Sequence, residues 1–122
     1  MKIYKCMKCG KMVEEIKGSG CVPMCCGEFM TEMKAGASDG AFDKHVPVYE
    51  TTGTHVSVKV GSTEHPSMDA HYIEWIAIET TSGSQKKCLK PGMTPAAEFE
   101  LTEGETVTAV YAYCNLHGLW KA

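Results

Sequence analysis

The sequence contains no uninterrupted apolar run of about 18 residues, the length that a membrane-spanning helix needs. Its N-terminal stretch, from Met1 to Cys6, lacks the apolar core of a secretory signal peptide. Basic residues are not in excess either, because the net charge is −3, and this argues against a general nucleic-acid binder. Together these absences favour a cytoplasmic protein, whose thiols stay reduced.

A long helical period is also absent, and the number of cysteines is odd. Seven cysteines cannot all pair within one chain, so metal ligation explains them better than a disulfide scaffold does. The 122 residues suffice for one ordinary domain, or for a small module followed by one modest domain. A module of about 35 residues is below the size that usually folds without a metal or disulfides.

Four cysteines near the N-terminus have the spacing of a metal site. Cys6 and Cys9 form a Cys-x-x-Cys pair, and Cys25 and Cys26 are adjacent. Two such pairs offer four sulfurs to one tetrahedral ion, which selects zinc or iron. Consecutive side chains normally point apart, so a turn at the second pair must bring both sulfurs to one side. Cys21 falls outside this pattern.

Glycines and small polar residues mark the limits of this N-terminal module. Gly10 and Gly27 each follow a cysteine pair, where a positive φ is often needed. Residues 34–41 are small and polar and predict a linker. We therefore expect a thiol module over residues 1–36 and a second domain over residues 37–122.

The second domain has the pattern of a mainly β fold. Short segments with strand character alternate with turn signals from about residue 46 onward. The expected strands cover residues 55–60, 72–79, 85–90, 97–101 and 106–113, of which the last leads into Cys114. Many short strands at regular spacing predict an antiparallel sandwich or barrel. Cys88 is expected to be a half-buried strand residue.

A second group of donors mixes imidazoles with one thiolate and suits a more reactive metal. Its members are His45, His65, His71, Cys114 and His117. Each lies in a loop or beside a turn, and three loops of a sandwich can converge at one end. His55 differs, because it shares its strand face with Ser57 and Lys59 and is expected to point to solvent.

The residue patterns leave other interpretations open. The thiol spacing is also compatible with a structural zinc ribbon that has no redox role. A Cys-x-x-His at a strand end also occurs in blue-copper proteins, which use a weak axial methionine. No methionine follows His117, so Met68 or Met93 would have to replace it.

Taken together, the motifs resemble the desulfoferrodoxin family, the two-iron class of superoxide reductases, over the whole chain. In the thiol module the resemblance rests on Cys6-x-x-Cys9 and Cys25-Cys26-Gly27. In the second domain it rests on Lys44-His45-Val46-Pro47, Gly61-Ser62-x-x-His65-Pro66, His71-Tyr72-Ile73-Glu74-Trp75-Ile76, Leu89-Lys90-Pro91-Gly92 and Cys114-Asn115-Leu116-His117-Gly118-x-Trp120-Lys121.

The resemblance implies a desulforedoxin-like iron module followed by an immunoglobulin-like antiparallel β-sandwich, usually as a homodimer. It also implies a one-electron reduction of superoxide to hydrogen peroxide, with electrons from a rubredoxin-like donor. The implied ligands of one iron are Cys6, Cys9, Cys25 and Cys26. Those of the catalytic iron are the equatorial imidazoles of His45, His65, His71 and His117 and the axial thiolate of Cys114.

Two further residues are implied to act at the catalytic iron. Lys44 is the candidate for attracting the anion and for ordering a proton-donating water. The family usually has glutamate where this chain has Asp43, and that glutamate can bind the oxidised iron. Asp43 is one methylene shorter, so we expect a weaker or absent carboxylate ligand. The main alternative function is a two-centre iron electron carrier that binds no anion catalytically.

Overall fold

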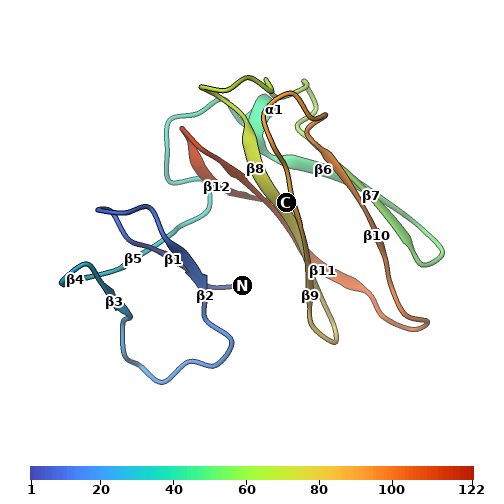
Figure 1. Cartoon of the computed structure of the whole chain (residues 1–122). Coiled ribbons are helices and arrows are strands. Elements are labelled where there is room, and N and C mark those ends of the chain that lie inside the picture. Colours follow the sequence, from blue (N-terminus) through green and yellow to red (C-terminus); the bar gives the residue numbers. More distant parts are fainter. The chain divides into compact units, whose positions relative to one another are not determined.

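The computed structural model describes residues 1–122 of the chain. The chain divides into two compact units, Met1–Lys34 and Ala35–Ala122 (Figure 1). The boundary expected from the sequence, between residues 36 and 37, lies just beyond this division. None of the helices has the length and the apolar character needed to cross a membrane.

The first unit is built from short strands around a very small core. Its strands are β1 (Ile3–Lys5), β2 (Met12–Glu14), β3 (Met24–Cys25), β4 (Glu28–Phe29) and β5 (Thr31–Glu32). One sheet has the order β2-β1-β5, and β3 and β4 form a separate hairpin. Its buried cluster consists of Tyr4, Cys6 and Met30. This small buried apolar surface is not enough to stabilise the fold of the unit, so we expect a bound metal to contribute to its stability.

The second unit consists of two antiparallel sheets (Figure 1). One sheet has the order β10-β7-β6 and is formed by β6 (Pro47–Thr52), β7 (His55–Val60) and β10 (Ala96–Glu100). The other has the order β12-β11-β8-β9 and is formed by β8 (Ile73–Thr80), β9 (Ser84–Cys88), β11 (Val107–Cys114) and β12 (Gly118–Lys121). A single helical turn, α1 (Phe42–His45), precedes β6 in the chain. The predicted mainly β fold is confirmed.

The alternation of apolar residues along the strands explains how the two sheets pack. In β7 the side chains of Val56, Val58 and Val60 are buried. They join one cluster with residues of β8, β10 and β11, among them Ile76 and Phe99. Each buried valine of this kind contributes about 1.5–3 kcal/mol through burial of apolar surface.

Three details of the second unit differ from the expectations. The segment 106–113 is not the last strand, because β12 follows it after a tight turn and pairs with β11. The strand β12 has only four residues, beginning at Gly118, and these are too few to show a hydrophobic period. Cys88 is exposed and not half-buried, because β9 is the edge strand of its sheet. His45 belongs to α1 and not to an irregular loop.

The carboxylate of Glu105 joins two turns at one end of the sandwich. It accepts hydrogen bonds from the hydroxyls of Thr80 and Ser82 in the β8–β9 turn. It also accepts bonds from the backbone N–H and the hydroxyl of Thr102, at 2.9 and 2.8 Å. These donors, the Thr80 hydroxyl first, lower the pKa of Glu105 to about 2, because they stabilise the charged form.

Replacing Glu105 by glutamine is expected to lower the free energy of unfolding at neutral pH. The folded-state pKa lies below the ordinary value of 4.5, so the stabilisation is present above pH 4.5 and disappears as the pH falls towards about 2. Urea unfolding of the metal-free protein at several pH values measures this. Glu103→Gln, which removes an exposed charge of the same sign, is the control. A difference between wild type and Glu105→Gln that is independent of pH would contradict the account.

Candidate metal centres

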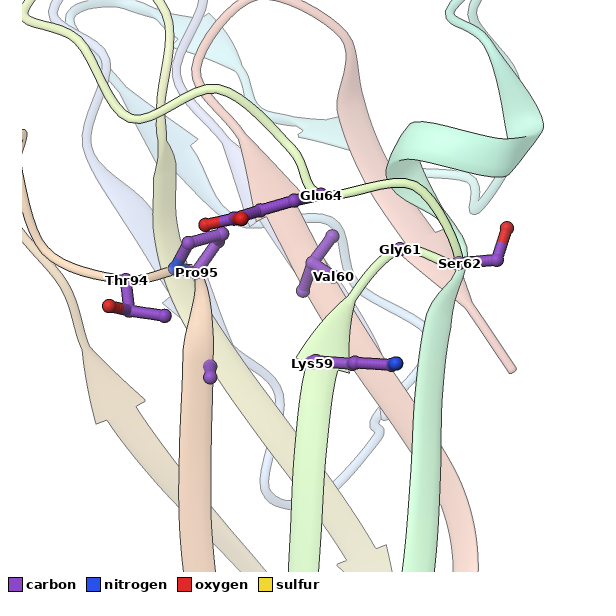
Figure 2. A pocket seen from close by; sticks show the side chains of 8 residues that line it. Lys59, Val60, Gly61, Ser62, Glu64, Thr94 and Pro95 are labelled. Carbon is purple, nitrogen blue, oxygen red and sulfur yellow. The ribbon is translucent and has the colours of Figure 1, made fainter.

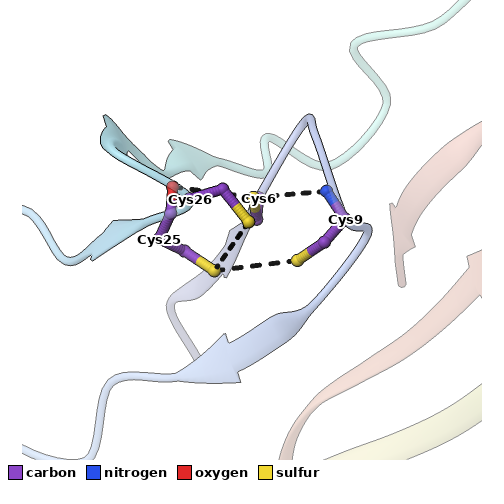
Figure 3. A group of neighbouring side chains, drawn as sticks. All are labelled: Cys6, Cys9, Cys25 and Cys26. Carbon is purple, nitrogen blue, oxygen red and sulfur yellow. Dashed lines mark hydrogen bonds between the residues drawn. The ribbon is translucent and has the colours of Figure 1, made fainter.

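The four cysteines of the first unit converge on one point (Figure 3). Their sulfur atoms all lie within 4.8 Å of one another. The Sγ atom of Cys25 is 3.7 Å from that of Cys9 and 3.9 Å from that of Cys26. Ligands of a tetrahedral ion with metal–sulfur bonds of about 2.3 Å are separated by about 3.8 Å, so the spacing fits such an ion.

Local backbone conformation produces this convergence. Cys26 has a φ of 52°, in the left-handed region, and this turns its side chain to the same side as that of Cys25. The turn that follows Cys6 is closed by a bond from the Gly10 N–H to the Cys6 carbonyl, at 2.9 Å. Gly10 and Gly27 have φ values of 80° and 76°, as expected from their places after the cysteine pairs.

The electrostatics of the four thiols require a cation. The backbone N–H of Cys9 donates to the sulfur of Cys6 at 3.4 Å and is the main reason that the pKa of Cys6 falls to about 6. Hydrogen bonding to the neighbouring thiols, that of Cys9 first, raises the pKa of Cys26 to about 12. The raised pKa of Cys26 opposes its ionisation beside the other thiols, whereas a bound metal ion would deprotonate its ligands.

The four imidazoles of the second group are arranged in a square, in which each contacts two neighbours. Adjacent ring centroids are 4.7 Å apart for His45 and His65 and 4.6 Å for His65 and His71. They are 5.1 Å apart for His71 and His117 and 4.7 Å for His117 and His45. Adjacent rings are steeply inclined to one another, whereas His45 and His71 face each other across 6.1 Å. Four imidazoles in a square are the arrangement that four equatorial ligands adopt.

Hydrogen bonds select which nitrogen of His45 and of His65 faces the centre of this square. The Nδ1 atom of His45 donates to the carbonyl of Ala41, and that of His65 donates to the carbonyl of Pro66, both at 2.7 Å. Their Nε2 atoms are thus left with lone pairs, and these two atoms are 3.2 Å apart. The Nε2 atom of His71 is buried and has no hydrogen-bond partner. Such an orphan nitrogen fits a metal ligand.

Burial keeps these imidazoles neutral and able to bind a metal. Only 2% of His45 and 1% of His65 are exposed. Desolvation is the main cause that lowers the pKa of His65 to about 4, and it also lowers the pKa values of His45 and His71. At neutral pH the nitrogen lone pairs are therefore not occupied by protons.

Cys114 adds the thiol to this group from the end of β11. Its side chain is fully buried, and its sulfur lies 3.8 Å from the Nδ1 atom of His117. Burial raises the pKa of the Cys114 thiol, while backbone N–H groups of His117 and Leu116 oppose that effect. The His117 N–H donates to the sulfur at 3.4 Å. Such bonds tune a thiolate ligand.

The structure brings the predicted ligands of the second group together. Donor atoms of His45, His65, His71 and Cys114 all lie within 4.8 Å of one another, and His117 adjoins them through its ring contacts and the Cys114 sulfur. Four nitrogens and one sulfur suit a redox metal such as iron. Cys21 and His55 are in neither group; His55 is exposed and contacts Glu98 and Glu100.

Two residues, Trp120 and Ser38, support the ligands through contacts that the sequence did not indicate. Trp120 stacks on the ring of His45 at 4.9 Å, and its indole N–H donates to the carbonyl of His117 at 3.1 Å. The hydroxyl of Ser38 donates to the same carbonyl at 2.6 Å. Ser38 lies within the predicted linker, and nothing in its neighbourhood in the sequence indicates this contact.

The two other candidate residues lie beside the ring of histidines. Asp43 and Lys44 belong to α1 and precede His45, and both are exposed. The carbonyl of Asp43 accepts bonds from the Thr63 N–H at 2.9 Å and the Ser62 hydroxyl at 3.2 Å. No ion pair engages the Lys44 ammonium, so its charge is available to a ligand in solution.

Known proteins share both the sequence and the fold. Residues 37–122 match the family model for desulfoferrodoxin. The desulfoferrodoxin of Nitratidesulfovibrio vulgaris is 50% identical over 121 residues, which cover 99% of this chain and 94% of that relative. The desulfoferrodoxin homolog of Archaeoglobus fulgidus is 43% identical over 122 residues, 100% of this chain and 96% of that relative.

Solved structures agree with this match. The superoxide reductase from Treponema pallidum has a TM-score of 0.83 and 34% sequence identity, and the superposition covers 98% of each chain. A superoxide reductase from Giardia intestinalis has a TM-score of 0.56 and 33% identity, covering 66% of this chain and 95% of that chain.

The two groups are expected to bind metal independently of each other. Cys114→Ser should abolish binding to the histidine group and leave the four-cysteine group loaded, and Cys25→Ser should have the opposite effect. Metal analysis with the visible spectra of both variants measures this, and Cys21→Ser is the control that keeps both metals. Loss of both metals from either variant would contradict the independence.

Proposed function

The chain belongs to the desulfoferrodoxin family, and from this premise we propose that it is a superoxide reductase. The reaction converts superoxide, one electron and two protons into hydrogen peroxide. The observation that carries the proposal is the square of four imidazoles, two of them fully buried, with the Cys114 sulfur beside it. Superoxide reductases of the same fold, such as the Treponema pallidum protein, support it.

The proposed ligands divide the two irons between the two units. His45, His65, His71, His117 and Cys114 would hold the catalytic iron. Cys6, Cys9, Cys25 and Cys26 hold the other iron. Iron in the histidine group would supply the electron that superoxide accepts.

The protein residues contribute imidazole nitrogens, a tuned thiol and one exposed positive charge. The N–H groups directed at the Cys114 sulfur stabilise its negative charge. Lys44, on the turn that carries His45, attracts the superoxide anion and orders a water that donates protons. This local charge matters because the chain carries a net charge of −3, which repels an anion.

The reaction needs a source of electrons, for which we propose a rubredoxin-like donor. Whether the four-cysteine iron relays these electrons can be measured with Cys25→Ser, whose turnover with such a donor should be slower.

The free thiols of the protein suit a reducing compartment, so we place the protein in the cytoplasm. Fractionation of the source cells checks that location.

We also propose a homodimer. The first unit exposes large apolar side chains, among them Ile16, 88% exposed, and Phe29, 70% exposed. Such residues on so small a unit are typical of an association surface. Light scattering at increasing protein concentration measures the mass, and a constant monomer would refute this part.

The activity itself is tested by mixing the reduced, iron-loaded protein with superoxide from a radiolysis pulse. A superoxide reductase yields hydrogen peroxide and no oxygen, and one protein centre is oxidised for each superoxide consumed. A dismutase yields both products and needs no donor. A two-centre electron carrier leaves superoxide unconsumed and binds neither cyanide nor azide.

Lys44→Ala is expected to slow the second-order reaction with superoxide by about tenfold or more, because the charge that steers the anion is lost. Lys44→Arg should retain most of the rate. Lys87→Ala removes an exposed lysine of β9 and is the control for net charge. The rates are compared at low ionic strength, and equal rates for Lys44→Ala and Lys87→Ala would refute the steering role.

Asp43→Glu is expected to change the absorption spectrum of the oxidised protein, because the longer side chain gains the reach that Asp43 lacks. The bonds from Thr63 and Ser62 hold the Asp43 carbonyl, so the backbone is not free to move the shorter side chain inward. Asp43→Asn should leave the spectrum as it is in the wild type. A shift with Asp43→Asn would mean that Asp43 already binds the metal.

A further inference from the structure

The loop between β7 and His65 contacts the backbone of α1. The N–H of Thr63 and the hydroxyl of Ser62 both donate to the carbonyl of Asp43. The loop follows Val60, a core residue at the end of β7. It ends at His65, whose backbone N–H donates to the Val60 carbonyl at 2.9 Å. One short loop therefore carries one proposed ligand and holds the segment that carries another, His45.

Gly61 is the residue of this loop at which no side chain would fit against α1. A Cβ atom at this position would lie 2.6 Å from the carbonyl oxygen of Asp43 and 2.9 Å from the carbonyl carbon of Lys44. Both are backbone atoms, which cannot rotate away as a flexible side chain can. Only glycine therefore allows the loop to approach α1 this closely.

The helical turn α1 depends on this contact. It spans only Phe42–His45, and its N-terminal residue, Ala41, provides no side-chain cap. A single turn is unstable by itself, because its few internal hydrogen bonds do not offset the loss of conformational entropy. The loop thus holds α1 from one side, while Trp120 contacts the rings of Phe42 and His45.

A cavity of about 250 Å³ lies on the other side of the loop (Figure 2). Gly61 and Ser62 line it from the loop, and Thr94 and Pro95 line it from the segment before β10. A side chain added at Gly61 would meet rigid backbone on the α1 side and open space on this side. The loop would therefore shift towards the cavity, away from α1.

We propose that residues Gly61–Thr63 are a positioning device that sets the separation of His45 and His65. Their Nε2 atoms are 3.2 Å apart, and both histidines are fixed to this loop, one by the chain and one through α1. None of the three residues would touch metal or substrate. The inference rests only on the metal-binding part of the proposed function, and not on the reaction.

The experiment compares Gly61→Ala with Gly83→Ala in iron-loaded protein. Gly83 has open space where a Cβ would be added, so its substitution is the matched control. Gly61→Ala should release metal from the histidine group to a chelator about tenfold faster or more, the size typical of losing support for a ligand. Its spectrum should change as well. The four-cysteine group of the same molecules should release metal at the wild-type rate.

The metal-release rates of these variants test whether the loop positions the ligands. Equal release rates and spectra for Gly61→Ala and Gly83→Ala would overturn the proposal. If Gly61→Ala does not fold, Ser62→Gly decides, because it removes the hydroxyl bond and adds no atom that could clash. We expect it to release metal about threefold faster through the loosened ligand, and an unchanged rate would overturn the proposal. Metal release is measurable whatever the substrate is, so failure here is distinct from failure of the proposed activity.

Discussion

The Nε2 lone pairs of His45 and His65 face each other across 3.2 Å inside the protein, with both Nδ1 atoms already donating to backbone carbonyls. Burial lowers the pKa values of both rings, which favours the neutral forms whose Nε2 atoms carry no proton when Nδ1 donates. A cation relieves this repulsion and also provides the missing partner for the Nε2 atom of His71. The rest of the second unit serves to hold these atoms in place against their mutual repulsion.

The sandwich achieves this by bringing donors from separate segments to one end. The strand β11 ends at Cys114, the turn to β12 carries His117, and the loop after β7 carries His65. The strand cores are rigid because their side chains are closely packed, so the ends of the strands are well placed. The first unit differs, because its apolar core is too small to hold the four cysteines in place. A metal bound by their sulfurs would stabilise the fold of this unit.

Much of this organisation could be predicted from the sequence. Period-two alternation predicted β7 and most of β10, apolar segments between turn signals predicted most of β8 and β11, and the cysteine spacing predicted the first group. The loop positions of the histidines suggested the second group, but scattered histidines carry no periodic signal, so the roles of its members came only from the resemblance to a family. β12 and the exposure of Cys88 were not predicted, since short strands and sheet edges depend on tertiary pairing. The contact of Gly61 with α1 joins residues far apart in sequence and could be found only in the structure.

X-ray absorption at the iron edge tests the central claim most directly. The measurement uses Cys25→Ser protein, in which iron is confined to the histidine group. The account predicts an iron surrounded by four imidazole nitrogens and one sulfur. An iron without a sulfur neighbour, or with fewer imidazoles around it, would contradict the account.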